Sequence, residues 1–300
     1  MPKIIAPQKI DLAKETTFRV GCVASEVYLP SDTEEFCELL ATLPNPEILG
    51  AGSNVIVSSE SVNVPVILTR NLNQFSIEDA IVSAQCGVKT ALLAQKTLGA
   101  ELSGFEFLTC IPASIGGIVH MNASAHKQSV ADVIVSAKVF DTSTKQVLEL
   151  SKEQLELEYR TSVLQKKPYV LLEAKFYLTK TDKESIKMRM EANKAYRTQN
   201  HPCMKTPNAG STFRNPEGAV AGRLIEESGL KGTSIGGAKV SEIHANFTVN
   251  YNNATSFDIL SLMSLVQDEV QKKYGYKLKP EVKYIGNSEK EEKIWQKLNN

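Results

Sequence analysis

Hydrophobic residues recur every three or four positions in two segments of the chain, which predicts two amphipathic helices. In residues 31–43, Ser31 and Asp32 precede a face formed by Phe36, Leu39, Leu40 and Leu43. In residues 255–275, Thr255 and Asp258 have the spacing of a capping box, and Gly275 stands where a helix C-terminal cap is expected. The pattern therefore predicts both the helices and their ends.

Short apolar runs between polar or glycine-containing stretches predict β-strands. The run "EILGAGSNVIVS" predicts a strand, a loop and a second strand, and "AIVSAQCGV" predicts a strand that leads into a helix near residues 92–97. Further strands are expected in "VIVSAKVFD", "YVLLEAKFYL", "HANFTVN" and "LKPEVKYI". Strands and helices mixed in this way predict the α+β fold class.

The charged segment 182–200 has only a weak apolar stripe, which is typical of a connecting helix. We place the main domain boundary near it. The expected domains are residues 1–70 and 71–190 as two subdomains and 191–286 as a C-terminal α+β domain. The charged stretch 287–300 is expected to be an exposed helical tail.

Composition excludes several classes of function. The 34 basic residues balance 34 acidic residues, so no global positive field favours nucleic acid or an anionic membrane. No apolar run reaches the roughly 18 residues of a membrane span, and the first residues do not resemble a signal peptide, so a cytoplasmic location is expected. No metal site is expected either, because the five cysteines and four histidines form no metal-binding motif.

The segment 110–126, "CIPASIGGIVHMNASAH", gathers small residues in the middle of the chain. Pro112 and the pair Gly116 and Gly117 would let backbone amides approach a bulky group, while Asn122 and Ser124 add compact donors. Taken alone, the segment is equally compatible with a packing interface of small residues.

A second glycine loop, residues 50–54, reads "GAGSN". The following residues have strand character, so the loop does not fit the dinucleotide fold, in which a helix follows. Consecutive amides of such a loop can still converge on an anion, although a plain β-turn would look the same. Together, the two loops suggest a long ligand with a pyrophosphate held by the main chain.

The stretch 209–216, "AGSTFRNP", places the Ser211 hydroxyl beside a cation and an amide. No histidine or aspartate nearby in sequence would make Ser211 a nucleophile, which favours proton donation, with a solvated turn as the alternative. Arg160 in "YRTS" and Glu281 in "PEVK" would be read as surface charges from the sequence pattern alone.

Eight segments, in order along nearly the whole chain, resemble one family: the flavoenzyme UDP-N-acetylenolpyruvoylglucosamine reductase of bacterial peptidoglycan synthesis. The segments are "TTFRVG", "LGAGSN", "GFEFLTCIPASIGGIVHMNA", "YRTS", "AGSTFRNP", "LIEESGLKG", "GGAKVSEIHANFTVN" and "PEVKYIG". Each motif alone is weak, whereas the ordered set is highly specific.

The resemblance implies a two-subdomain FAD-binding fold of the p-cresol methylhydroxylase and vanillyl-alcohol oxidase type, followed by the C-terminal substrate domain. It implies non-covalent FAD and NADPH as co-substrate. The implied reaction reduces UDP-N-acetylglucosamine enolpyruvate to UDP-N-acetylmuramate, with no nucleic acid, membrane or protein partner.

The resemblance also implies roles for individual residues. Ser211 resembles the proton donor, and Arg160 and Glu281 resemble the pair that stabilises the enolate formed by hydride addition. Contacts with FAD are implied for Gly50, Ala51, Gly52, Ser53, Asn54, Pro112, Ala113, Ser114, Gly116, Gly117, Asn122 and Ala123, and contacts with the substrate for Arg214, Asn215 and Lys283. The short connection between "YRTS" and "AGSTFRNP" resembles the subtype that lacks the substrate-capping tyrosine loop.

Several positions depart from the usual pattern of the family. Ala113 and Ser124 replace glycines, and His126 with Lys127 replaces a common Tyr-Gly pair. Such replacements need backbone strain only where φ is positive. Other departures are Ile118, Cys22 and Lys283. They leave two alternatives to the reductase: a flavin oxidase of the same cofactor fold acting on another small molecule, and a non-catalytic flavin-binding or nucleotide-sugar-binding protein.

Overall fold

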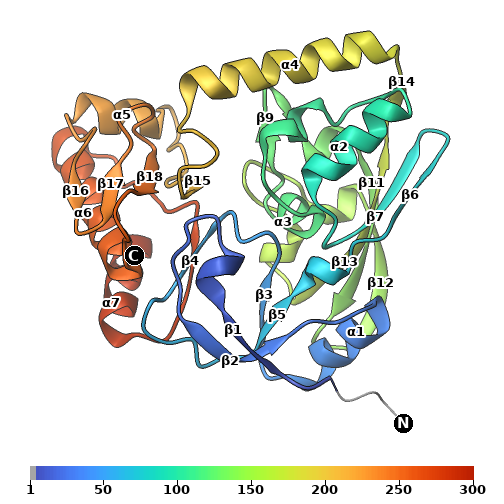
Figure 1. Cartoon of the computed structure of the whole chain (residues 1–300), viewed down its shortest axis with the longest axis horizontal. Helices are drawn as coiled ribbons and strands as arrows, with labels where there is room; N and C mark the ends of the chain where they lie inside the picture. Colours follow the sequence, from blue (N-terminus) through green and yellow to red (C-terminus); the bar gives the residue numbers. More distant parts are fainter. Residues whose placement is uncertain (1–4) are drawn as a thin grey trace. The chain divides into compact units, whose positions relative to one another are not determined.

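The computed structural model describes residues 5–300, and residues 1–4 at the start of the predicted first subdomain lie outside the described residues. The chain forms two compact units, each built from separate stretches (Figure 1). The first holds Val27–Ala51 and Pro65–Arg197, and the second holds Gln8–Glu26, Gly52–Val64 and Thr198–Asn300. These interleaved units differ from the consecutive domains expected from the sequence.

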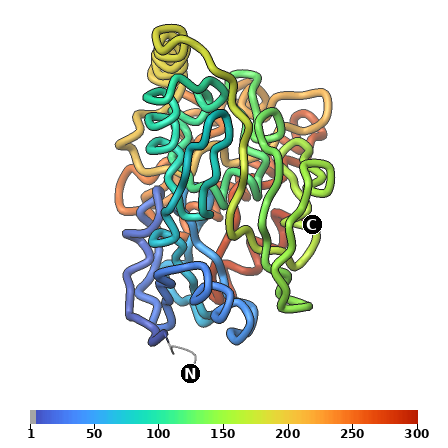
Figure 2. The backbone as a smooth tube through the Cα atoms, turned by 90° about the vertical axis from the view of Figure 1, so that its right-hand side faces the viewer, coloured from blue at the N-terminus to red at the C-terminus, as the bar shows by residue number. Residues whose placement is uncertain are grey.

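A five-stranded antiparallel sheet forms the centre of the first unit, and Figure 2 shows its green strands as long, adjacent runs. Its order is β12 (Gln146–Ser151), β11 (Ile134–Asp141), β13 (Tyr169–Tyr177), β7 (Ile81–Gln85) and β6 (Phe75–Glu78). The predicted strands in "AIVSAQCGV", "VIVSAKVFD" and "YVLLEAKFYL" are β7, β11 and β13. The hydrophobic core of this unit includes Phe105 and Phe176, which make an edge-to-face contact.

A parallel arrangement of short strands lies earlier in the chain. Within the first unit, β5 (Val66–Leu68) pairs with β3 (Glu47–Leu49) and with the end of β2 (Val23–Tyr28). The predicted helix is α1 (Thr33–Thr42), and Asp32 caps it by accepting the Glu35 N–H at 2.9 Å.

The remaining elements of the first unit are short, apart from α2 and the long helix α4. They are α2 (Thr90–Gly99), β8 (Leu102–Ser103), α3 (Ile115–His120), β9 (Ser124–Ala125), β10 (Gln128–Ser129), β14 (Thr179–Lys180) and α4 (Lys183–Asn200), whose last residues belong to the second unit. Single 3₁₀ turns span Thr69–Asn71, Glu106–Cys110, Val130–Asp132, Glu153–Leu155 and Val163–Gln165.

The second unit contains a four-stranded antiparallel sheet. Its order is β15 (Asn208–Ser211), β18 (Phe247–Asn250), β17 (Ala238–Val240) and β16 (Ser234–Ile235). Helix α5 (Ala221–Glu227) lies between β15 and β16 in the chain, and α6 (Ser256–Tyr274) follows β18. The predicted capping box of Thr255 and Asp258 is present at the start of α6. Gly275 ends this helix with a φ of 77°, as the sequence predicts.

The last strand of the chain pairs with an early one. β19 (Lys283–Ile285) lies parallel to β4 (Val55–Val57) in the second unit, which also contains β1 (Gln8–Asp11) and a 3₁₀ turn, Leu12–Glu15. This pairing explains why residues 52–64 belong with the C-terminal stretch.

The C-terminal segment forms α7 (Glu289–Asn299), which lies beside α6 (Figure 1). It is helical as predicted, but the expectation of an exposed tail is wrong. Leu298 is fully buried in the core of the unit, and Glu291 is fully buried as well. The Glu291 carboxylate accepts hydrogen bonds from the hydroxyls of Ser58 at 2.7 Å, Tyr284 at 2.8 Å and Ser256 at 2.5 Å.

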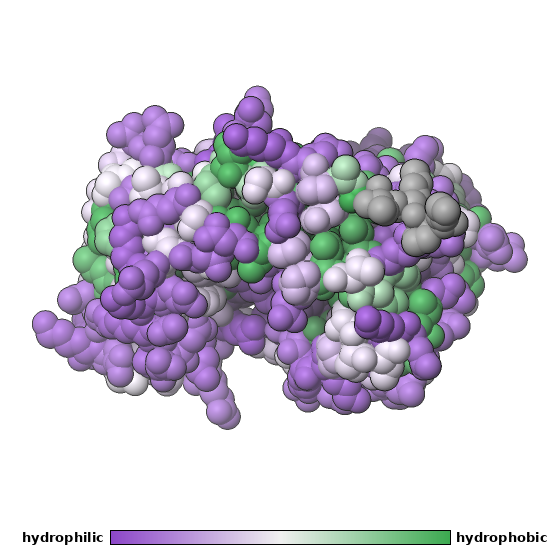
Figure 3. Space-filling model, turned by 90° about the horizontal axis from the view of Figure 1, so that it is seen from below, coloured by the Kyte–Doolittle hydropathy of each residue, from purple (hydrophilic) through white to green (hydrophobic). Residues whose placement is uncertain are grey.

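Polar residues cover most of the face seen in Figure 3, with apolar residues in patches between them. Among residues 5–300, no helix is long and apolar enough to cross a membrane. The same residues contain no group of three or more histidine, cysteine, aspartate or glutamate side chains arranged to hold a metal ion.

Candidate active site

The first unit brings the two predicted cofactor segments together at Gly50 and Ser114. A Cβ atom at Gly50 would lie 2.3 Å from the Ser114 Oγ atom, so a side chain there would displace the Ser114 hydroxyl. Ser114 is 3% exposed, and among the described residues its hydroxyl has no hydrogen-bond partner. An unsatisfied buried hydroxyl costs about 1–3 kcal/mol, so a polar ligand atom at this point would stabilise the structure.

Gly116 and Gly117 begin the short helix α3, where an irregular loop was expected, and they differ in their surroundings. The Gly116 N–H donates to the Cys86 carbonyl at 2.7 Å, and a Cβ atom at Gly116 would lie 3.2 Å from the same oxygen. Gly116 is therefore required for packing against the end of β7. Gly117 is exposed, and the nearest atom to an added Cβ is 3.8 Å away, so it is free to face a ligand.

Asn122 uses its side chain inside the protein. Its Nδ2 donates to the Glu158 carbonyl at 2.9 Å, and its Oδ1 accepts the Ala131 N–H at 3.0 Å. The carboxamide thus has partners inside the protein, and the expectation that it also donates to the cofactor stays a prediction. Its role is to hold the turn at residues 158–161, since Glu158 and Thr161 exchange two backbone hydrogen bonds of 3.2 Å.

Arg160 lies in that turn with a φ of 55°. Its Nη1 donates to the Ser124 Oγ at 2.8 Å, which connects it to the predicted cofactor segment. Ser124 is thus an acceptor that the usual glycine could not provide. The guanidinium also lies 5.3 Å from the ring centre of Tyr159.

The departures from the family pattern have different structural costs. Ala113 and Ser124 have no positive φ, so their side chains cause no strain. His126 and Lys127 have φ values of 53° and 64° and form the turn between β9 and β10, where two positive angles favour glycine. The His126 ring lies edge-on to Tyr196, and burial lowers the pKa of His126. Of the other predicted cofactor residues in this unit, Pro112 is exposed, and Ala51 and Ala123 are half-buried.

The second half of the glycine loop belongs to the second unit. Gly52 has a φ of 60°, and an added Cβ atom would lie 2.0 Å from the Glu15 carbonyl, so the position requires glycine. Asn54 connects the loop to the C-terminal part of the chain: its Nδ2 donates to the Glu281 carbonyl at 3.1 Å, and its carbonyl accepts the Lys283 N–H at 3.0 Å. Ser53, between them, is half-buried.

Ser211 and Glu281 lie on segments of the second unit that are joined by a backbone hydrogen bond. Ser211 ends β15, and the next carbonyl, that of Thr212, accepts the Glu281 N–H at 2.8 Å. Gly210 has a φ of 76° where the register between β15 and β18 shifts, and such an irregularity re-aims the following side chain. Arg160, the third predicted catalytic residue, belongs to the other unit.

Two of the predicted substrate residues, Arg214 and Asn215, follow the same turn in the chain. The Arg214 N–H donates to the Lys279 carbonyl at 2.9 Å, and among residues 5–300 its buried Nε has no hydrogen-bond partner. Asn215 Oδ1 accepts the Ala221 N–H at the start of α5 at 3.0 Å. Lys283 is exposed on β19.

Sequence reasoning missed Asn246, whose carboxamide binds the main chain of Phe213 directly after Ser211 and Thr212. Its place in the motif "HANFTVN" was the available signal, but the motif was read as a strand and as part of the family resemblance, with no role for Asn246.

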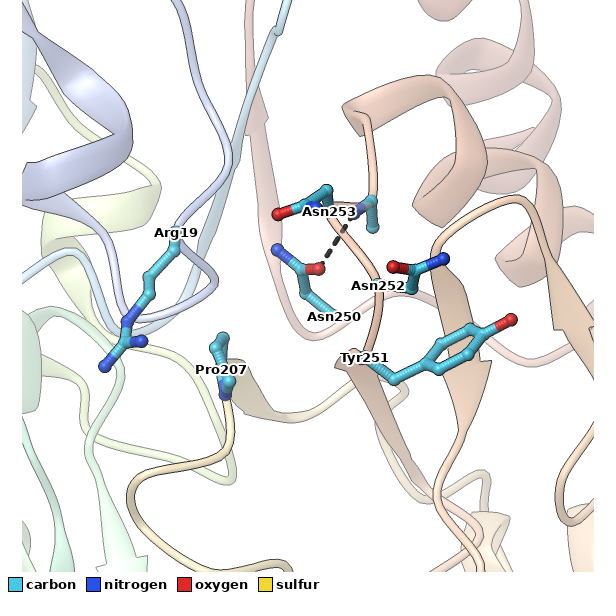
Figure 4. Close-up of a pocket in the computed structure, with 7 residues that line it drawn as sticks. Arg19, Pro207, Asn250, Tyr251, Asn252 and Asn253 are labelled. Atoms are coloured by element: carbon cyan, nitrogen blue, oxygen red, sulfur yellow. Dashed lines mark hydrogen bonds between the residues drawn. The ribbon is translucent and has the colours of Figure 1, made fainter.

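A polar pocket of about 440 Å³ lies elsewhere in the second unit (Figure 4). Its walls come from Arg19, Pro207 and the asparagine-rich stretch 250–254. The Asn250 side chain is committed to the protein, because it accepts the Ala254 N–H at 2.8 Å and donates to the Phe18 carbonyl at 3.1 Å. None of the predicted site residues lines this pocket.

Comparison with known proteins identifies the family. Residues 24–151 match the model of an FAD binding domain, and residues 201–285 match that of the UDP-N-acetylenolpyruvoylglucosamine reductase C-terminal domain. The enzyme of that name from Bacillus subtilis is 39% identical over 284 residues, which cover 92% of this chain and 93% of that protein. The chain belongs to the UDP-N-acetylenolpyruvoylglucosamine reductase family.

Further relatives support the assignment to the reductase family. The Caldanaerobacter subterraneus reductase is 37% identical over 92% of both chains, and the Clostridium botulinum reductase is 40% identical over 92% of this chain and 90% of its own. The crystal structure of the Thermus caldophilus reductase matches with a TM-score of 0.82 and 32% identity, covering 94% of this chain and 99% of that one. The predicted fold class, FAD-dependent oxidoreductase activity and role in peptidoglycan synthesis are confirmed, and the two alternative functions are not supported.

Proposed function

We propose that this reductase converts UDP-N-acetylglucosamine enolpyruvate to UDP-N-acetylmuramate through Ser211, Glu281 and Arg160, with NADPH as the hydride source. The observation that carries the proposal is the placement of Ser211 and Glu281 on hydrogen-bonded segments of the second unit. A hydroxyl and a carboxylate held by the same backbone pairing suit a reaction that must protonate a carbon beside a stabilised enolate.

The residues of the first unit fit the FAD that the family uses. Ser114 offers a buried hydroxyl that has no hydrogen-bond partner in the described part of the chain, Gly50 keeps the space beside it open, and Gly117 leaves room for a close approach. These residues would hold FAD by main-chain and hydroxyl contacts, without a covalent bond. When bound, the flavin supplies hydride transfer.

The chain's own residues handle the charge that hydride addition creates on the substrate. Addition to the enolpyruvyl double bond leaves negative charge shared between the neighbouring carbon and the carboxylate, and a guanidinium such as Arg160 stabilises that charge. Glu281 organises this arrangement, and the Ser211 hydroxyl donates the proton. A serine hydroxyl is a weak acid, so it can act only on a strongly basic carbon at which it is aimed.

Arg214, Asn215 and Lys283 are proposed to contact the substrate. The buried Nε of Arg214, which has no hydrogen-bond partner among residues 5–300, offers a donor for an anionic oxygen. A reaction that consumes NADPH and a nucleotide sugar also supports a cytoplasmic location, which fractionation of cells would test.

The experiment that tests the proposal separates the two half-reactions by stopped-flow absorbance of the flavin under anaerobic conditions. Ser211→Ala should leave flavin reduction by NADPH unchanged and slow reoxidation by the enolpyruvyl substrate by about 100-fold or more, as for a lost general acid. Ser234→Ala, at an exposed position of β16 in the same sheet, is the matched control. If Ser211→Ala slowed flavin reduction by NADPH but left reoxidation by the substrate normal, the assignment of Ser211 as proton donor would be contradicted.

A further inference from the structure

One of the buried side chains that hold the turn carrying Ser211 is Asn246, which is 5% exposed. Its Oδ1 accepts the Phe213 N–H at 3.0 Å, and its Nδ2 donates to the Phe213 carbonyl at 2.8 Å. Its own carbonyl accepts the Thr212 N–H at 2.7 Å. Both residues that follow Ser211 are therefore bound to Asn246.

Asn246 is in turn held by the ring of His244. The Asn246 N–H donates to His244 Nδ1 at 3.2 Å. An imidazole nitrogen can accept such a hydrogen bond only when it carries no proton, so this contact depends on the Nδ1 atom. The hydrogen bond between His244 and Asn246 therefore depends on a single acceptor atom of the imidazole ring.

The imidazole of His244 is itself closely packed. It stacks on His201, with ring centres 5.1 Å apart and planes 10° from parallel, and it makes an edge contact with Phe247 at 5.0 Å. Gly222 of α5 leaves the space for it, because a Cβ atom there would lie 3.1 Å from the His244 Cε1 atom. The ring therefore has little freedom to move its Nδ1 atom away from Asn246.

We infer that His244 is a positioning residue for Ser211, acting through the Asn246 main chain and carboxamide. The inference rests on the proposed role of Ser211 as proton donor. Loss of the acceptor would leave the buried Asn246 N–H unsatisfied and let the turn shift. A displacement of about 1 Å at a reacting group can cost on the order of 100-fold in rate.

Two substitutions of His244 separate positioning from packing. His244→Phe keeps an aromatic ring for the stack but removes the acceptor. His244→Asn removes the ring but restores an acceptor, because an asparagine Oδ1 readily accepts the N–H two residues later in the chain. His201→Phe is the matched control, since it keeps the stack and leaves the Nδ1 acceptor of His244 in place.

We expect reoxidation of the reduced holoenzyme by UDP-N-acetylglucosamine enolpyruvate to slow about 10- to 100-fold in His244→Phe. It should stay within a few-fold of the parent rate in His244→Asn and His201→Phe, and reduction by NADPH should be unchanged in all three. Thermal unfolding should show that His244→Asn is the less stable of the two His244 variants. If His244→Asn is less stable but is reoxidised at the parent rate, His244 does not act through stability alone.

Equal rates in His244→Phe and His244→Asn, whether both slow or both normal, would overturn the inference. Should His244→Phe not yield holoenzyme, Asn246→Asp tests the next step of the same connection, the carboxamide contact with Phe213, because its second carboxylate oxygen would face the Phe213 carbonyl. A normal second half-reaction in Asn246→Asp would also overturn it. If Ser211→Ala itself reacts normally, the proposed proton donor is wrong, whereas a slow Ser211→Ala beside a normal His244→Phe rejects only the positioning role.

Discussion

Replacement of Glu291 by alanine should destabilise the second unit strongly, although Glu291 stands in the most charged stretch of the chain. The carboxylate is fully buried and accepts hydrogen bonds from the hydroxyls of Ser58, Ser256 and Tyr284. Ser58 and Ser256 are themselves completely buried, so without Glu291 their O–H groups lose an acceptor that water cannot replace.

The magnitude follows from those two serines. Each unsatisfied buried hydroxyl costs about 1–3 kcal/mol, and removal of a buried charge returns part of that cost. We therefore expect a loss of about 3 kcal/mol in the free energy of unfolding. Substitution of the neighbouring, exposed Glu292 by alanine should change it by less than about 0.5 kcal/mol.

Urea denaturation followed by circular dichroism measures the difference, with the transition of the second unit assigned through the fluorescence of Trp295, which lies on α7. The slope with urea should be similar in all variants, so that the midpoints report stability. A loss below about 1 kcal/mol for Glu291→Ala, or one equal to that of Glu292→Ala, would refute the reasoning.

Three further predictions concern the first unit. Gly117→Val should lower the ratio of flavin to protein absorbance, whereas Gly116→Val should lower the melting temperature through its contact with Cys86. If both variants lost flavin equally and had the same melting temperature, the different roles of the two glycines would be contradicted. Ser124→Gly should slow substrate reduction about tenfold, the effect of losing a hydrogen bond of about 1.4 kcal/mol to Arg160, with unchanged flavin content; a parent rate would leave Ser124 without a role. Burial raises the pKa of the Cys86 thiol to about 12, so the unfolded chain loses this proton at a lower pH than the folded protein does. The free energy of unfolding should therefore fall as pH rises from about 9 toward 12. If the urea midpoints fell equally in Cys86→Ala, the Cys86 thiol would not be the cause of this fall.

Local signals in the sequence predicted the elements well. The capping box of Thr255 with Asp258 and the left-handed Gly275 are properties of a few adjacent residues, so they could be read without the fold. The same holds for the strand, loop and strand around residues 47–58. Family membership also followed from ordered local motifs.

Burial and side-chain use could not be predicted in the same way. Glu291 looked exposed because its hydrogen-bond donors, Ser58 and Ser256, are 233 and 35 residues away in the chain. Asn122 looked like a donor for a ligand, but Glu158 and Ala131 already bind its carboxamide. These hydrogen-bond partners depend on which distant segments meet in the fold, and the spacing of hydrophobic residues does not predict such long-range contacts.

The interleaving of the two units has a consequence for the order of events during protein synthesis. Strand β4 leaves the ribosome early, but its parallel partner β19 and the helix α7 are made at the end of the chain. With 233 residues between Ser58 and Glu291, synthesis at about 5–20 residues per second delays their meeting by roughly 10–50 s. During that interval the nascent chain carries an unpaired strand and uncovered apolar side chains, which is the state that chaperones recognise. The second unit should therefore acquire protease resistance only after the full chain is released, whereas the first unit can become resistant while translation continues.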